Sequence, residues 1–171
     1  KMGDTLITVV AIVLAATLMF VFPLMTMSNR ADDVSQLSVQ SLTTQFVDDV
    51  RTTGKITSDK YNKFVENIHS TGNTYDVEIE VNVRDEYIGK NTTHANSKKI
   101  GEDVYYSIYT TQIENTLKNN NAYNLKEGDI VSVSVKNTNT TMSQQLSGGT
   151  STGLTGTIAG EASGIVTANG N

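Results

Sequence analysis

The first thirty residues, KMGDTLITVVAIVLAATLMFVFPLMTMSNR (residues 1–30), contain a long apolar run. No charged side chain occurs between Thr5 and Asn29, and Leu, Ile, Val, Ala, Met and Phe fill most of these positions. About 20 apolar residues in a helix cross the roughly 30 Å hydrocarbon layer of a bilayer, because each residue rises about 1.5 Å. Apolar residues occur on every side of the predicted helix, which is typical of a helix surrounded by lipid or by other apolar helices. The run therefore predicts a membrane-length helix over residues 1–30.

A cleaved secretory signal is the alternative interpretation of this run. Its apolar region is usually about 7–15 residues long and ends at small residues. The run here is longer and leads into FPLMTMSNR (residues 22–30) without an Ala-x-Ala type site. Lys1 and the terminal amine precede the run, and positive charge tends to stay on the cytoplasmic side. We therefore expect the N-terminus in the cytoplasm and the residues after Arg30 outside.

The composition excludes several classes of site. The 171 residues include no Cys, so the chain has no disulfide and no thiolate metal site. The formal net charge is −5, and the thirteen Lys and Arg residues are scattered along the chain. A nucleic-acid surface needs clustered basic residues, so this distribution argues against one.

The segment that follows the apolar run predicts more helix and then a second, short helix. Residues 31–54, ADDVSQLSVQSLTTQFVDDVRTTG, carry apolar side chains at helical spacing with polar residues between them. No helix breaker lies between Arg30 and Thr53, so one helix of about 50 residues, or about 75 Å, is expected to end at Gly54. Residues 57–72 predict a short helix capped by Thr57 or Ser58 and ended by Gly72.

Three later segments alternate between apolar and polar residues, which predicts strands. TYDVEIEVNVRD (residues 74–85) does so over its whole length, and DVYYSIYT (103–110) and DIVSVSVKN (129–137) do so more briefly. Antiparallel pairing with one wet face explains such patterns best. Between the last two strands, TTQIENTLKNN (110–120) predicts a short helix with a Thr cap.

The predicted fold class is thus α+β, with a long N-terminal helix and a small head that contains a mainly antiparallel sheet and short helices. We divide the chain into the apolar helix (1–30), its amphipathic continuation (31–53), the head (54–146) and a tail (147–171). The tail is rich in Gly, Ser and Thr, which normally means a flexible segment. It also carries apolar residues that could anchor it as an added strand on the head of its own or an adjacent subunit: Leu154, Ile158, Ile165 and Val166.

Patterns that would indicate catalysis or ligand binding are weak. His69 and His94 are far apart and lack metal-site spacing. Asp32-Asp33 and Asp48-Asp49 lie on the polar face of the predicted helix, where solvated charge explains them. Asn91 and Asn139 begin glycosylation sequons, which we interpret as loops. No catalytic, cofactor-binding or metal site is therefore predicted, and the chain is not expected to be an enzyme.

An apolar helix at the start, Pro23 within it, amphipathic continuation to about Thr53 and a small α+β head resemble type IV pilins. The tight-adherence branch and its pseudopilins look nearest, and VYYSIYTTQIENTLKNNNAYNLKEGDIVSVSVKN (104–137) looks like the soluble domain of such proteins from Gram-positive bacteria. In the family, a peptidase cuts a basic leader after Gly, and an acid at position five of the mature helix meets the amine of a neighbouring subunit. Here position five is Thr5, and the nearest acid is Asp4, preceded by KMG.

The resemblance implies a structural subunit of a type IV-like pilus on the bacterial cell surface. The subunit would polymerise with itself through the apolar helix, after insertion in the inner membrane and with the help of a pilus assembly machinery. A single-pass anchored binding protein, or a minor pseudopilin of a pilus or secretion assembly, is the alternative. An acid buried among apolar helices needs a cation, so Asp4 is expected to meet Lys1 or the amine of its own or a neighbouring copy.

Pro23 is the only proline in the chain. Because proline cannot donate a hydrogen bond to the carbonyl of Met19, a kink or an unwound stretch is expected at or just before it, with extra hydrogen bonding from Thr17 softening the penalty. The other candidate assembly residues are apolar side chains of the same run: Leu14, Phe20 and Phe22.

Overall fold

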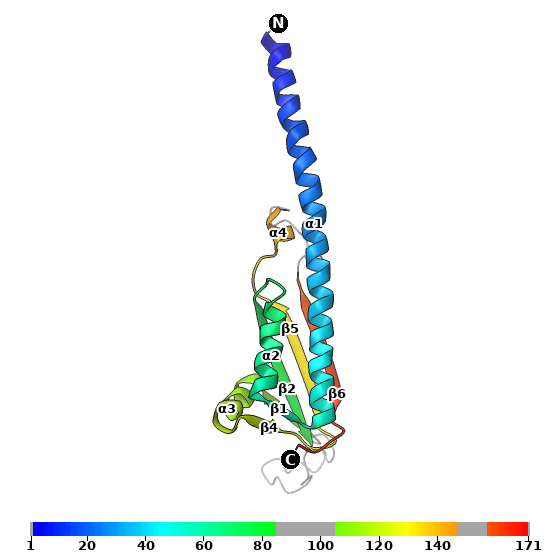
Figure 1. The fold of residues 1–171 in the computed structure, drawn as a ribbon, viewed down its shortest axis with the longest axis vertical. Coiled ribbons are helices and arrows are strands. Elements are labelled where there is room, and N and C mark those ends of the chain that lie inside the picture. The colour runs from blue at the N-terminus through cyan, green and yellow to red at the C-terminus, as the bar shows by residue number, and fades with distance from the viewer. Residues whose placement is uncertain (1, 85–104, 147–156, 171) are drawn as a thin grey trace, which may run out of the picture.

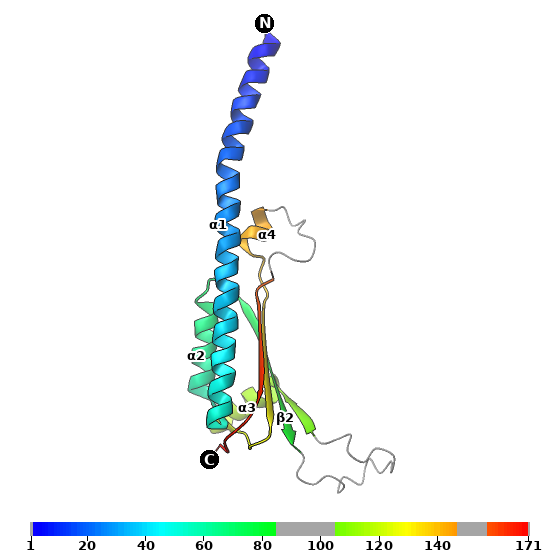
Figure 2. The ribbon, with the colours of Figure 1, turned by 90° about the vertical axis from the view of Figure 1, so that its right-hand side faces the viewer.

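The computed structural model describes residues 2–84, 105–146 and 157–170, and it has the α+β fold that the sequence predicts. Helix α1 (Met2–Thr53) runs the length of the molecule, and its C-terminal half lies along the head (Figure 1). The N-terminal half projects beyond the head as a bare rod. The view from the side shows α1 and helix α2 (Ser58–His69) on one side of the sheet (Figure 2).

Helix α1 ends where the sequence predicts. Gly54 has a positive φ of 67°, and its N–H donates to the carbonyl of Val50 at 2.8 Å. The backbone of residues 168–170 passes so close to Gly54 that a Cβ at this position would have no room. Glycine is therefore required here both by the backbone conformation and by the packing of the end of the chain.

Helix α2 is tied to α1 by packing and by charge. The hydroxyl of Thr57 accepts from the N–H of Lys60, so Thr57 is the N-cap. The helix ends at His69 with Ser70 as its C-cap, two residues earlier than the Gly72 cap that the sequence suggests. The ring of Phe64 stacks on Phe46 of α1 with 4.4 Å between the centroids. This stacking of the two aromatic rings holds α2 against α1.

The main sheet has four antiparallel strands in the order β3-β2-β5-β6. Their bounds are Tyr75–Arg84 for β2, Tyr105–Tyr109 for β3, Ile130–Asn137 for β5 and Ala159–Ile165 for β6. The strands β2, β3 and β5 confirm the predictions from alternation. Strand β6 comes from the Gly-rich tail, so the tail range contributes to the sheet of the head within the same chain.

On the face of the sheet that meets the helices, the side chains become smaller from β2 to β6. The register aligns three rows across β2, β5 and β6: Val77, Val135 and Gly160; Ile79, Val133 and Ala162; Val81, Val131 and Gly164. Residues two apart in a strand share a face, so the branched side chains fill the centre of the core and the small ones lie under α1. The helix can then approach the backbone of β6 closely.

Short elements complete the head. Helix α3 (Thr110–Asn120) forms where the sequence predicts a helix, and it buries Ile113 and Leu117. Its N-cap, however, is Tyr109. The hydroxyl of Thr110 instead accepts from the N–H of Ile79 at 2.7 Å. The predicted Thr cap is therefore wrong, because Thr110 is used to join α3 to β2. The sequence did not predict the two-stranded sheet of β1 (Lys55–Thr57) and β4 (Ala122–Asn124), nor helix α4 (Met142–Leu146).

Replacing Gly160 by Val should weaken the packing of α1 against β6. A Cβ at this position would lie 2.9 Å from Oγ1 of Thr43, 3.0 Å from Cγ1 of Val39 and 3.1 Å from the Val39 carbonyl oxygen. Overpacking of this kind costs about 1–3 kcal/mol of unfolding free energy, which denaturant unfolding of the full chain in detergent measures. Ser163→Val, on the exposed face of the same strand, is the matched control and should change stability by less than about 0.5 kcal/mol. Equal stability of both variants would contradict this packing.

The head should lose stability at alkaline pH. Burial raises the pKa of Tyr123 to about 12, with smaller contributions from Tyr106 and Asp129. Burial and the hydrogen bond to Glu114 also raise the pKa of Tyr61. A tyrosine in the unfolded chain ionises near pH 10, so the stabilisation is complete below about pH 10 and is lost as the pH rises through the folded pKa. Circular dichroism against pH should show this loss, and Tyr123→Phe should move it to higher pH; an unmoved transition would rule out this origin.

Candidate assembly surfaces

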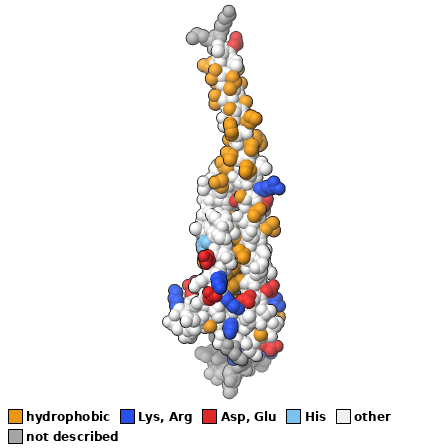
Figure 3. All heavy atoms as spheres, in the orientation of Figure 1, with side chains coloured by type: hydrophobic (Ala, Val, Ile, Leu, Met, Phe, Trp, Pro, Cys, Tyr) orange, Lys and Arg blue, Asp and Glu red, His pale blue; other side chains and the backbone are white. Residues whose placement is uncertain are grey.

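The N-terminal half of α1 exposes nearly all of its apolar side chains. Met19 is 77% exposed, and the expected assembly residues Leu14, Phe20 and Phe22 are also exposed. The helix is long and apolar enough to cross a membrane, and none of its most apolar 18-residue window is buried in the chain's own fold. Figure 3 shows these side chains gathered along the rod. A bare apolar surface of this size needs lipid or protein to cover it.

The rod is helical without interruption across Pro23. Every residue from 15 to 27 is α-helical, and Figures 1 and 2 show gentle curvature rather than a sharp kink. The expected unwound stretch is therefore absent from the single chain. Thr17 donates to the carbonyl of Val13 at 2.8 Å rather than to that of Met19, so it does not supply the hydrogen bond that Pro23 lacks.

The other candidate assembly residues lie at the start of the apolar run. Asp4 and Thr5 are exposed in the first turn of α1, where a carboxylate interacts favourably with the helix dipole. Lys1, the expected partner of Asp4, lies outside the described residues. At the other end Arg30 is exposed.

Two glutamines of α1 cover the outer edge of strand β6. The side-chain amide of Gln36 donates to the carbonyl of Ala159 and accepts from its N–H at 2.8 Å. Gln40, one turn later, does the same with Glu161, at 2.9 and 3.2 Å. Each amide thus satisfies the backbone groups that another strand would use. The edge of the sheet at β6 is closed by the chain's own long helix.

The end of the chain also binds the end of α1. The Nε of Arg51 donates to the carbonyl of Ile165 at 3.0 Å, and the N–H of Thr167 donates to the Arg51 carbonyl at 3.0 Å. Helix ends leave carbonyl groups without partners, and Thr167 satisfies one of them. Residues at and just after the end of β6 therefore hold the C-terminal end of α1 against the sheet.

The residues expected to anchor the tail have different environments. Ile158 is 1% exposed and Val166 is fully buried, so both lie in the core at the two ends of β6. Ile165 is 57% exposed, because successive strand residues point to opposite faces. It does not anchor the tail in the single chain. Leu154 lies outside the described residues.

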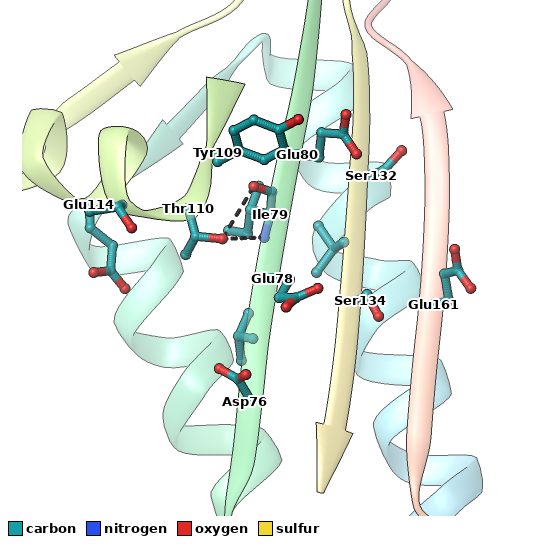
Figure 4. A pocket seen from close by; sticks show the side chains of 13 residues that line it. Asp76, Glu78, Ile79, Glu80, Tyr109, Thr110, Glu114, Ser132, Ser134 and Glu161 are labelled. Atoms are coloured by element: carbon teal, nitrogen blue, oxygen red, sulfur yellow. Dashed lines mark hydrogen bonds between the residues drawn. The ribbon is translucent and has the colours of Figure 1, made fainter. Parts of the chain in front are cut away.

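The face of the sheet away from α1 and α2 is polar and acidic. Figure 4 shows Asp76, Glu78, Glu80 and Glu161 on this face, in a groove of about 740 Å³. The hydroxyl of Ser107 lies 2.8 Å from both Glu80 and Asn82. In the part of the chain that the structure describes, no three His, Cys, Asp or Glu side chains come together as a metal site. The groove therefore offers scattered negative charge rather than a converging set of ligands.

Of the two aspartate pairs that the sequence analysis considered, Asp33 is exposed and the other three residues have side-chain partners. Asp48 pairs with Arg51 at 2.9 Å and Asp49 with Lys60 at 2.7 Å. Asp32 accepts a hydrogen bond from Ser143, which holds α4 against α1.

The remaining imidazole and amide candidates are used in turns or cannot be placed. An imidazole nitrogen of His69 lies 3.3 Å from the carbonyl of Asn73. Asn139 lies in a loop, as predicted, and its side chain accepts from the N–H of Thr74 at 3.0 Å. His94 and Asn91 lie outside the described residues.

Sequence reasoning missed Gln36 and Gln40. Their spacing of four places them on one helix face, which was the available signal, but the strand they bind lies more than a hundred residues later.

No family model, curated protein or solved structure matches this chain. The assignment of its function therefore depends on the surfaces described above.

Replacing Gln36 and Gln40 together by Leu should open the edge of β6. The change removes the amide hydrogen bonds to Ala159 and Glu161, each worth about 0.5–1.5 kcal/mol. Amide hydrogen exchange should become faster at these two residues. Gln45→Leu, at an exposed position on the same helix, is the matched control and should leave their exchange unchanged. Unaltered exchange in the double variant would contradict the edge closure.

Proposed function

We propose that the chain is a structural subunit of an extracellular type IV-like filament and polymerises through the apolar half of α1. The observation that carries the proposal is the bare rod, which is as long as a membrane span and is not covered by any of the described residues. In a bilayer, lipid covers it. Outside a bilayer, the rods of neighbouring copies can cover one another.

The free energy of burial is sufficient for such an assembly. About 25 cal/mol is gained per Å² of apolar surface removed from water. Some twenty apolar side chains therefore supply tens of kcal/mol before the cost of ordering the subunits is subtracted. The head would face outward from a core of helices, and the closed β6 edge would not add strands from other copies. Self-association through α1 follows from these properties.

A single-pass anchored protein with a binding head, or a minor subunit of a pilus or secretion assembly, is the second candidate. It uses the same helix as an anchor, and the acidic groove on the open face of the sheet favours it. Acidic side chains on an open surface suit a basic partner. In both cases the subunit would be inserted in the bacterial inner membrane with its head outside. Only in the filament case would assembly machinery then extract it to build a polymer.

Cells that produce the chain should carry filaments that contain it. Mechanical shearing should release the chain from the cell surface, and negative-stain microscopy with an antibody against the head should label filaments along their length. Cells that lack the chain are the control and should lose the labelled filaments. Retention of all the chain in the membrane fraction, with no labelled filaments, would reject the filament and favour the anchored protein.

A further inference from the structure

Opposite charges stand at the two ends of the apolar run. Asp4 and Arg30 border a segment without any charged residue, and they lie about 39 Å apart along the helix at 1.5 Å per residue. Neither side chain forms an ion pair or hydrogen bond with any described residue; Asp4 is bonded only through its carbonyl, which accepts from Thr8. The two charges cannot meet within one straight helix. A second copy can bring them together.

The helix faces that carry these charges differ in side-chain size. Residues at spacings of four, seven and eleven share one face of a helix. Counting from Asp4, these positions hold small side chains: Thr8, Ala11 and Ala15. Counting from Arg30, the same spacings hold Val34, Leu37 and Ser41. Val34 and Leu37 are 62% and 71% exposed, although they lie beside the polar head.

The two faces fit each other when one copy is displaced by 26 residues, the separation of positions 4 and 30. In a parallel pair with this displacement, Asp4 meets Arg30, Thr8 meets Val34, and Ala11 meets Leu37. Small residues let two helices approach closely, so the large side chains of one face have space on the other. A groove of about 730 Å³ between α1 and the end of α2 also lies beside Val34 and Leu37, and it leaves room for a second helix.

We propose that the Asp4 face of one copy packs in parallel on the Arg30 face of a second copy, displaced by about 39 Å. This inference depends on the proposed filament function and names its subunit contact. Asp4 and Arg30 are about 80° apart around the helix at 3.6 residues per turn. Because the two faces are different surfaces, each copy can bind one neighbour through each face. Because each contact also shifts the next copy along the helix axis, such heterologous contacts cannot close into a ring and repeat into an open helical filament rather than stopping at a dimer.

The displacement has a consequence for leaving the membrane. In this arrangement the copy that contributes Asp4 lies farther from the cytoplasm than the copy that contributes Arg30. Because about 39 Å exceeds the roughly 30 Å of hydrocarbon in a bilayer, the Asp4 copy would have left the bilayer while the Arg30 copy remains in it. In this register residues 4–15 of the copy that has left the bilayer lie against residues 30–41 of the copy still in it, and lipid still covers the apolar run of the second copy.

A fully overlapped antiparallel pair would also bring Asp4 to Arg30. It would place the two heads at opposite ends of the paired rods, and hence on opposite sides of a membrane. Copies that all insert in one direction cannot form it. The parallel arrangement is therefore the one that a membrane-inserted subunit can reach.

Charge reversal tests the ion pair in the full-length chain. Asp4→Arg and Arg30→Asp should each lower the yield of sheared filaments roughly tenfold, equivalent to about 1.4 kcal/mol, and the double reversal should restore it. Asp33→Arg, a reversal three residues from Arg30, is the matched control and should keep most of the yield. Membrane fractionation checks that each variant is inserted. Inserted single variants with normal yield, or a double reversal as poor as the singles, would overturn the pair.

Disulfide trapping tests the register with both charges in place, since the chain has no Cys of its own. Thr8→Cys with Val34→Cys in one chain should link successive copies and give a ladder of oxidised multimers in sheared filaments. Thr8→Cys with Thr26→Cys is the matched pair for the antiparallel arrangement, which would give closed dimers. Absence of the ladder, or dimers from the second pair, would overturn the parallel contact. If the unchanged chain forms no filaments at all, the proposed function fails instead.

Discussion

The uncovered apolar half of α1 is the constraint on which the rest of this structure depends. A helix that must lie in lipid or among other helices cannot also belong to the core of its own head. The chain therefore uses the two halves of one continuous helix differently. Residues up to about Asn29 present apolar side chains outward, whereas Val39, Val47 and Val50 turn one face into the sheet. Because α1 has no break before Gly54, a force on the rod is transmitted directly to the head.

The head is organised to hold this helix tightly with few large side chains. Small residues of β6 let α1 lie against the strand, and amide groups of Gln36 and Gln40 bind the strand's free edge. Residues after β6 then bind the end of α1 and the backbone around Gly54. The last strand of the sheet is thus held by β5 on one side and by α1 on the other. A Gly-rich composition, which usually permits disorder, here permits close packing.

Local patterns in the sequence predicted the elements whose signals are local. The alternation of Val77, Ile79 and Val81 was enough to identify β2, and helical spacing identified α2 and α3. Strands β1 and β4 have three residues each, too few to show a period, and they exist because they pair with each other across more than sixty residues. The contact of Gln36 with Ala159 joins residues 123 positions apart, so no window of sequence contains it. The exposed apolar residues of the rod were predictable, but which of them meet in an assembly depends on a second copy.

The distribution of closed and open surfaces indicates how copies of this chain can associate. Addition of strands at β6 is blocked by the helix amides, and the opposite edge, β3, has only five residues, which makes it a poor template for pairing. The outer face of the sheet is acidic, so identical copies would repel one another there. The rod remains as the large exposed apolar surface, and in the proposed filament self-association there would lower the free energy. In an assembly joined through α1, the acidic outer face of the sheet would remain accessible, because the proposed contact lies on the other side of the head.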